Sequence, residues 1–163
     1  MEVIDLIKGP ASEGDTFSKL ALAFLNAYKQ ERTDEVMDTY REIVDGDTSC
    51  DSRIFALQLL LMLGKSELAQ KEAQKLLESS VELVIPYKAH IKYLAYGNIK
   101  ELERSSPNFC NFVIALKSYA EGDYETARKY FEKTVKGQYI SAQYWWAKVY
   151  LKDWNKTKRR VPP

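Results

Sequence analysis

The sequence has few of the residues that form catalytic and metal centres. Its 163 residues include one histidine and two cysteines. His90 stands alone on an expected helix, and neither Cys50 nor Cys110 has a second ligand at metal-binding spacing. A Cys–His nucleophile would also need an orienting group and an oxyanion pocket, and no motif supplies either. We therefore expect no enzyme activity, no metal and no cofactor, and the isolated thiols fit a reducing compartment.

Long apolar runs and glycine-rich loops are also missing. No apolar run reaches about 18 residues, so no membrane-spanning helix is expected. The first ten residues are acidic and are interrupted by Gly9-Pro10, unlike a secretory signal. The seven glycines are scattered, mostly at expected helix ends, so they form no phosphate-binding loop. Together these absences predict a cytoplasmic protein.

Charge is nearly balanced over the whole chain but unevenly distributed along it. The formal net charge is +1. Residues 1–52 carry 5 basic and 12 acidic side chains, whereas residues 128–163 carry 10 and 2. A linear arrangement of helices would therefore have an acidic end and a basic end, which would orient a partner and speed its encounter.

The segment Ile114–Val135 has the pattern of two helices joined by a tight turn. Gly122 stands where the first helix must end in a left-handed residue, a conformation that glycine adopts without steric cost. Asp123 can then cap the second helix. Ala115 and Ala127 are small where the two helices must approach closely. The segment therefore predicts a helical hairpin.

The same turn recurs upstream at a regular spacing. Two copies contain glycine, at Gly64 and Gly97, and a degenerate copy without glycine lies near Val36. The position of Val36 recurs twice at intervals of 33 residues, at Ala69 and Leu102. In this spacing the chain resembles the tetratricopeptide (TPR) repeats, whose period is about 34 residues.

The expected fold is all-α: an α-solenoid of about four TPR-like helix–turn–helix repeats plus a C-terminal helix. The helical domain is expected over residues 1–155, and a basic, disordered tail over residues 156–163. Ser106-Pro107 shortens the third repeat, because proline forces the residue before it out of helical geometry. The predicted helices are Thr16–Gln30, Asp34–Val44, Ser52–Leu63, Ser66–Ser79, Pro86–Tyr96, Asn98–Arg104, Asn108–Glu121, Asp123–Val135 and Ser141–Leu151.

The TPR resemblance implies a concave groove lined by the first helix of each repeat. In this chain the groove positions are apolar, whereas chaperone-tail-binding TPRs place lysine, arginine and asparagine there. An apolar groove this large either grips a partner or is filled by the protein itself. In the second case its residues pack on each other or on the N-terminal segment Val3–Ile7. The predicted groove residues are Leu25, Tyr28, Ile54, Leu61, Met62, Tyr87, Ile91, Leu94, Phe109, Phe112, Leu116 and Tyr119.

The C-terminal helix is rich in aromatic residues. Residues 140–151 carry two apolar stripes, and a single preceding helix can hardly cover both. Uncovered aromatic residues form binding hot spots, so Trp145 and Trp146 are predicted as a second partner-binding patch. Alternatively, the tail folds back over them. The basic run Lys156–Arg160 can contact nucleic-acid phosphates, or it is simply solvated.

The stretch Leu57–Glu72 is similar to the middle of the epsilon subunit of coatomer. A helix around Tyr87–Tyr96, the Ser106-Pro107 pair and the repeat at Gly122–Glu125 follow in the same order as in that family. Two features depart from it, since the chain is much shorter and its third repeat is truncated. The resemblance implies a vesicle-coat subunit held by the C-terminal region of the large alpha subunit.

The function expected from the sequence is therefore non-enzymatic. We expect a protein–protein interaction scaffold in vesicle-mediated transport, which grips a helix or hairpin of a larger subunit in its groove. Contact with a membrane would be only indirect, through the coat. The alternative is an adaptor of a nucleic-acid-associated assembly, tethered by Lys156–Arg160. Binding through the tail would weaken steeply with salt, whereas binding in the groove would change little.

Overall fold

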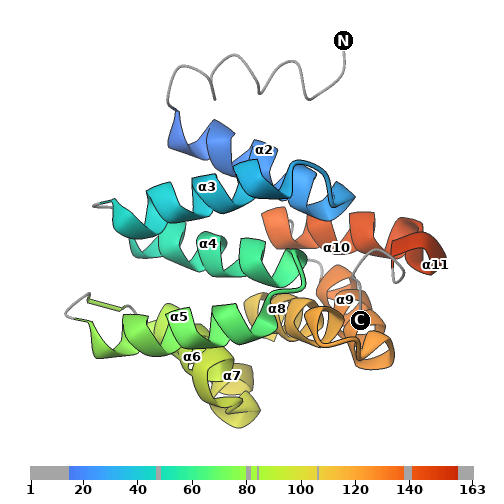
Figure 1. Cartoon of the computed structure of the whole chain (residues 1–163). Coiled ribbons are helices and arrows are strands. Elements are labelled where there is room, and N and C mark those ends of the chain that lie inside the picture. The colour runs from blue at the N-terminus through green and yellow to red at the C-terminus, as the bar shows by residue number, and fades with distance from the viewer. Residues whose placement is uncertain are drawn as a thin grey trace.

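The chain folds into packed helices. The computed structural model describes residues 15–46, 49–79, 82–83, 85–105, 107–137 and 141–157. Within these ranges the structure contains helices and no strand, which confirms the predicted all-α class (Figure 1). None of the helices in these ranges combines the length and the apolar character needed to cross a membrane.

Each predicted helix is present, with ends that differ by at most two residues from the prediction. A short helix near the C-terminus was not predicted. The helices are α2 (Thr16–Lys29), α3 (Thr33–Asp45), α4 (Cys50–Met62), α5 (Ser66–Glu78), α6 (Ile85–Tyr96), α7 (Ile99–Ser105), α8 (Pro107–Ala120), α9 (Tyr124–Lys136), α10 (Ala142–Lys152) and α11 (Trp154–Thr157).

The turn between α8 and α9 has the predicted conformation. Gly122 is left-handed, with a φ of 80°. Its N–H donates to the carbonyl of Tyr119, and the N–H of Asp123 donates to the carbonyl of Ser118, which together form a Schellman motif. The carboxylate of Asp123 then accepts from the N–H of Thr126 at 3.1 Å and caps α9.

The degenerate turn after α2 uses a glutamine in place of glycine. Gln30 ends α2 in the left-handed region, with a φ of 57°. This conformation is uncommon for a residue with a side chain. The side-chain amide of Gln30 donates to the carbonyls of Ala27 and Met62, each at 2.8 Å. These bonds offset the backbone cost and tie the end of α2 to the end of α4.

Each helix packs against its neighbours in the chain, and the even-numbered helices also pack against one another. Helix α4 contacts α2, α6 and α8, and α8 contacts α10. The even-numbered helices form the inner layer of the array. Its first and last helices, α2 and α10, also meet (Figure 1). Phe24 and Tyr28 of α2 lie 5.7 and 6.1 Å from the ring of Trp146 on α10. The helices therefore form a closed array.

Helix α11 extends past the expected end of the folded domain at residue 155. Thr157 is fully buried, and its carbonyl accepts a hydrogen bond from the hydroxyl of Tyr119 at 2.6 Å. The ring of Trp154 packs against Tyr119 and Phe131. Residues 156 and 157 thus belong to the packed helices, and residues 158–163 of the predicted tail lie outside the described residues.

Removing residues 156–163 is expected to destabilise the protein. The deletion removes the carbonyl that Tyr119 donates to, and a lost buried hydrogen bond costs about 1–3 kcal/mol. The melting temperature should fall by several degrees. The matched control is deletion of residues 158–163, which keeps Thr157 and should melt at a higher temperature than the larger deletion. Equal melting temperatures for both deletions in differential scanning calorimetry would contradict the role given to Thr157.

Candidate partner-binding surface

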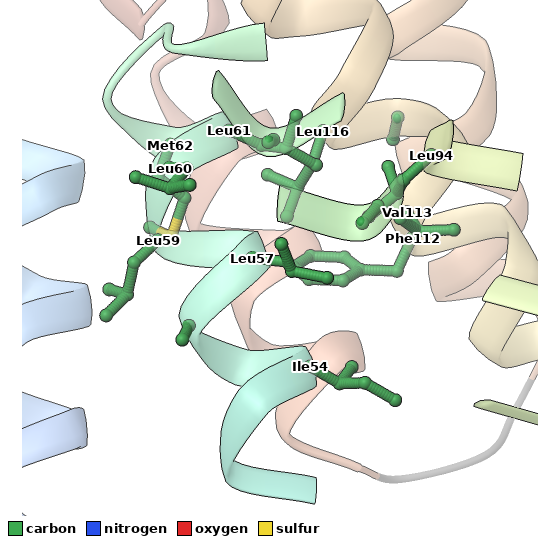
Figure 2. Close-up of a cluster of buried hydrophobic side chains, with 14 of the residues drawn as sticks. Ile54, Leu57, Leu59, Leu60, Leu61, Met62, Leu94, Phe112, Val113 and Leu116 are labelled. Atoms are coloured by element: carbon green, nitrogen blue, oxygen red, sulfur yellow. The ribbon is translucent and has the colours of Figure 1, made fainter. Parts of the chain in front are cut away.

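Most of the predicted groove residues lie in the hydrophobic core. Eight of the twelve side chains are at most 1% exposed. Figure 2 shows several of them together, with the ring of Phe112 on α8 directed towards α4. In this structure the inner face of the array is therefore filled by its own side chains, which is the self-packed arrangement. The eight residues are Ile54, Leu61, Met62, Ile91, Leu94, Phe112, Leu116 and Tyr119.

The physical reason is the composition of α4. Its C-terminal half, residues 56–62, is apolar on every face except for Gln58, and a helix that is apolar all round must be buried. Neighbours α2, α3, α5, α6 and α8 surround it. The array closes around α4, so groove positions turn towards other helices of the same chain.

The remaining predicted groove residues are at the edge of the core or outside the described side chains. Leu25, Tyr28 and Tyr87 are partly exposed. The ring of Tyr28 packs against Trp146 and Tyr150, and its hydroxyl donates to the carbonyl of Val149 at 3.3 Å. The side chain of Phe109 lies outside the described residues.

The structure describes the side chains of two of the three residues considered for chemistry, His90 and Cys110. His90 is fully buried, and burial lowers its pKa to about 3, so the imidazole is neutral. The thiol of Cys110 is also buried and donates to the carbonyl of Leu102 at 2.6 Å. The side chain of Cys50 is not described. In the described part of the chain no three metal-ligating side chains come together.

Helix α10 divides its aromatic residues between two environments. Trp146 is half-buried against α2, and Tyr150 is buried against the stacked ring of Phe131 at 4.8 Å. Trp145 points away from this packing and is 56% exposed. The two tryptophans predicted as one patch therefore have different roles, and only Trp145 is available at the surface.

Three further residues of α10 surround Trp145. Val149 lies one turn later and is 38% exposed. The ring of Tyr144 packs edge-on against Trp145 at 5.3 Å, and the ammonium group of Lys148 lies 5.4 and 5.1 Å from these two rings. We call this group, Tyr144, Trp145, Lys148 and Val149, the α10 patch. The i to i+4 spacing of Trp145 and Val149 places them on one face of the helix, but it does not show that this face is the exposed one.

Helices α9, α10 and α11 carry more basic than acidic residues. Among the described residues of α9, α10 and α11, only Arg128 forms an ion pair, with Glu132 at 3.1 Å. The lysines of these helices form no ion pair within the described structure, although Lys133 lies over the ring of Tyr130 and Lys148 over those of Tyr144 and Trp145. The lysines of the three helices are Lys129, Lys133, Lys136, Lys148, Lys152 and Lys156.

A small apolar hollow lies between α2, α4, α8 and α10. Its volume is about 130 Å³. We call it the α2–α10 hollow. One of its lining residues, Gln58, is 1% exposed, and within the described structure its Nε2 has no hydrogen-bond partner. The lining residues are Leu20, Ala21, Phe24, Phe55, Gln58, Phe112, Ala142, Gln143 and Trp146.

Comparisons with models of protein families, with curated proteins and with solved structures found no match.

Proposed function

We propose that this chain is a non-enzymatic protein-binding subunit of a larger assembly and that its partner docks on the α10 patch. The observation that carries the proposal is the exposure of Trp145 and Val149 on one face of α10 while the opposite face is packed into the array. A large exposed tryptophan next to an aliphatic residue is typical of binding hot spots.

The chemistry of the patch favours an amphipathic helix with acidic margins as the partner. Trp145 and Val149 would contact its apolar stripe, in the manner of helix–helix packing. Lys148 and Lys152 follow Trp145 by three and seven residues, so they flank the same face of α10. Acidic residues on the partner would complement them and would speed association.

The helical array and the motifs support a more specific reading of the assembly. We propose that the helix pairs are TPR-like repeats, on the basis of the 33-residue spacing and the layer of even-numbered helices. The similarity of Leu57–Glu72 to the epsilon subunit of coatomer favours a subunit of a cytoplasmic vesicle coat. In that reading the docked helix belongs to a larger coat subunit.

Replacing Trp145 with glutamate is expected to abolish partner capture without unfolding the chain. A hot-spot residue contributes 2 kcal/mol or more, which is at least about 30-fold in affinity. Because Trp145 is exposed, the melting temperature should change little. The measurement is a pull-down with the tagged chain, followed by mass spectrometry of the recovered proteins. Coat subunits recovered with the wild type but not with Trp145→Glu would support the proposal.

The matched control is Tyr96→Glu. Tyr96 is 65% exposed, but it lies at the end of α6 rather than on α10. This variant should capture the same proteins as the wild type. Equal loss with both variants would point to a general effect of added negative charge, and capture that persists with Trp145→Glu would exclude the α10 patch.

One observation favours the nucleic-acid alternative: the lysines on α9, α10 and α11 that form no ion pair in the described structure. Phosphates would satisfy these charges, and Tyr144 and Trp145 would offer rings for base stacking. In this case the chain should bind single-stranded oligonucleotides, and the affinity should fall steeply between about 50 and 200 mM salt. Capture of a helical protein partner should vary much less with salt.

A further inference from the structure

The α2–α10 hollow has the size and lining of a pocket for one aromatic ring. A cavity of about 150 Å³ with apolar walls holds a benzene molecule, and this hollow has a volume of about 130 Å³. Rings attract one another beyond the effect of burial, so aromatic walls favour an aromatic occupant. The rings that line the hollow come from four helices and are Phe24 on α2, Phe55 on α4, Phe112 on α8 and Trp146 on α10.

The lining residues differ in their exposure to solvent. Ala142 of α10 is exposed, and Ala21 of α2 is partly exposed. Gln58 of α4 and Phe112 of α8 are buried. The hollow therefore has its mouth at the surface beside Ala142 and its inner end at Gln58 and Phe112. Alanine side chains are short, so they leave the mouth open to a small molecule.

The described lining of the hollow contains no charged side chain. A charged ligand would lose its hydration there without meeting a counter-ion, and that loss is costly. The lining therefore selects a neutral compound.

Gln58 supplies one unused hydrogen-bonding group. Its side chain is 1% exposed, and its Nε2 has no partner within the described structure. A buried donor without an acceptor is costly, so an occupant that brings an acceptor is favoured over a hydrocarbon. The last torsion of a glutamine side chain is broad, so the amide can turn an N–H towards the occupant.

We propose that the α2–α10 hollow is a binding site for a small neutral aromatic compound that carries one hydrogen-bond acceptor. The ring lies among Phe24, Phe55 and Trp146, and a carbonyl oxygen or ring nitrogen accepts a hydrogen bond from Nε2 of Gln58. Such a ligand contacts α2, α4, α8 and α10 together, so its binding stabilises the closed array. This site is separate from the α10 patch, so it does not depend on the proposed function.

Titrations of the full chain with pyridine and with benzene test the proposal. They are followed by amide NMR spectra at neutral pH, where pyridine is uncharged. The two probes have rings of similar size, and only pyridine carries an acceptor. Both should cause saturable shift changes at the residues that line the hollow. Gln58→Met keeps the length of the side chain but removes the donor, so pyridine should bind about two- to tenfold more weakly relative to benzene.

Two variants fill the hollow from opposite sides. Ala21→Phe adds a ring from α2 and Ala142→Phe adds one from α10, and each should abolish the saturable changes. Because Ala142 is exposed, its replacement leaves the core intact. Lys29→Phe is the matched control, since it adds the same ring at an exposed position of α2, and it should bind both probes like the wild type.

Three results would overturn the proposal. If neither probe caused a saturable change at the lining residues of the wild type, the hollow would not be a binding site. Binding that persisted in both phenylalanine variants would place the probes elsewhere on the chain. An unchanged ratio of the two affinities in Gln58→Met would mean that Gln58 donates no hydrogen bond to the ligand.

Discussion

Phe112→Glu is expected to unfold the chain. Phe112 is fully buried, and its ring packs edge-on against Phe131 at 6.1 Å. Loss of a buried phenylalanine side chain costs about 3–5 kcal/mol. A carboxylate at the same place would be buried without a partner, which adds several kcal/mol more. The sum is comparable to the whole stability of a typical domain, about 5–15 kcal/mol.

Circular dichroism with urea denaturation measures this effect. The wild type should show a cooperative transition, and Phe112→Glu should show little helical signal or none at room temperature. Phe112→Leu keeps an apolar side chain of smaller volume, so it should fold with reduced stability. If Phe112→Glu instead retained the helical signal and the wild-type midpoint, Phe112 would have to face an open groove.

Stability should fall steeply in acid because of His90. Burial lowers the pKa of His90 to about 3 in the folded chain, whereas an unfolded histidine has a pKa near 6.5. The folded state therefore holds the imidazole neutral, and the unfolded state binds the proton first as the pH falls. Protonation of His90 has no effect on the free energy of unfolding above pH 6.5. Between pH 6.5 and about 3 it lowers that free energy, because only the unfolded state binds the proton. Each pH unit in that window costs about 1.4 kcal/mol, so pH 4.5 costs about 3 kcal/mol.

The measurement is the free energy of unfolding from urea titrations between pH 4.5 and 7.5, for the wild type and for His90→Leu. The two proteins share the same carboxylates, so the difference in their pH dependence isolates His90. The wild type should lose about 3 kcal/mol more than the variant over this range. Parallel pH dependences would mean that His90 becomes protonated within the folded protein.

Helices and turns could be predicted from the sequence because short-range interactions determine them. Gly122 and Asp123 illustrate this, since a left-handed glycine and a capping carboxylate act within a few residues. The turn at Gln30 could be placed by its spacing, but not explained, because it depends on the distant carbonyl of Met62. Helix α11 was missed because its burial depends on Tyr119, 38 residues earlier.

The candidate site was harder to predict because the closure of the array depends on contacts far apart in sequence. The same positions of Phe112 and Leu116 would face a groove in an open array, and they face α4 in this closed one. Periodicity alone could not distinguish Trp145 from Trp146, since either could have faced α2. The contact of Trp146 with Phe24 shows that Trp146 faces α2, and Trp145 is therefore left at the surface.

Closure between α2 and α10 also affects how the protein folds during synthesis. Most helical repeat proteins can fold stepwise, because each repeat contacts only its neighbours. Here the hydroxyl of Tyr28 meets the carbonyl of Val149, 121 residues later. At 5–20 residues per second, a ribosome takes roughly 6–24 s to make that stretch. During this time the apolar face of α2 that packs on α10 has no cover from α10, so the nascent chain is expected to be a substrate for chaperones until α10 has emerged.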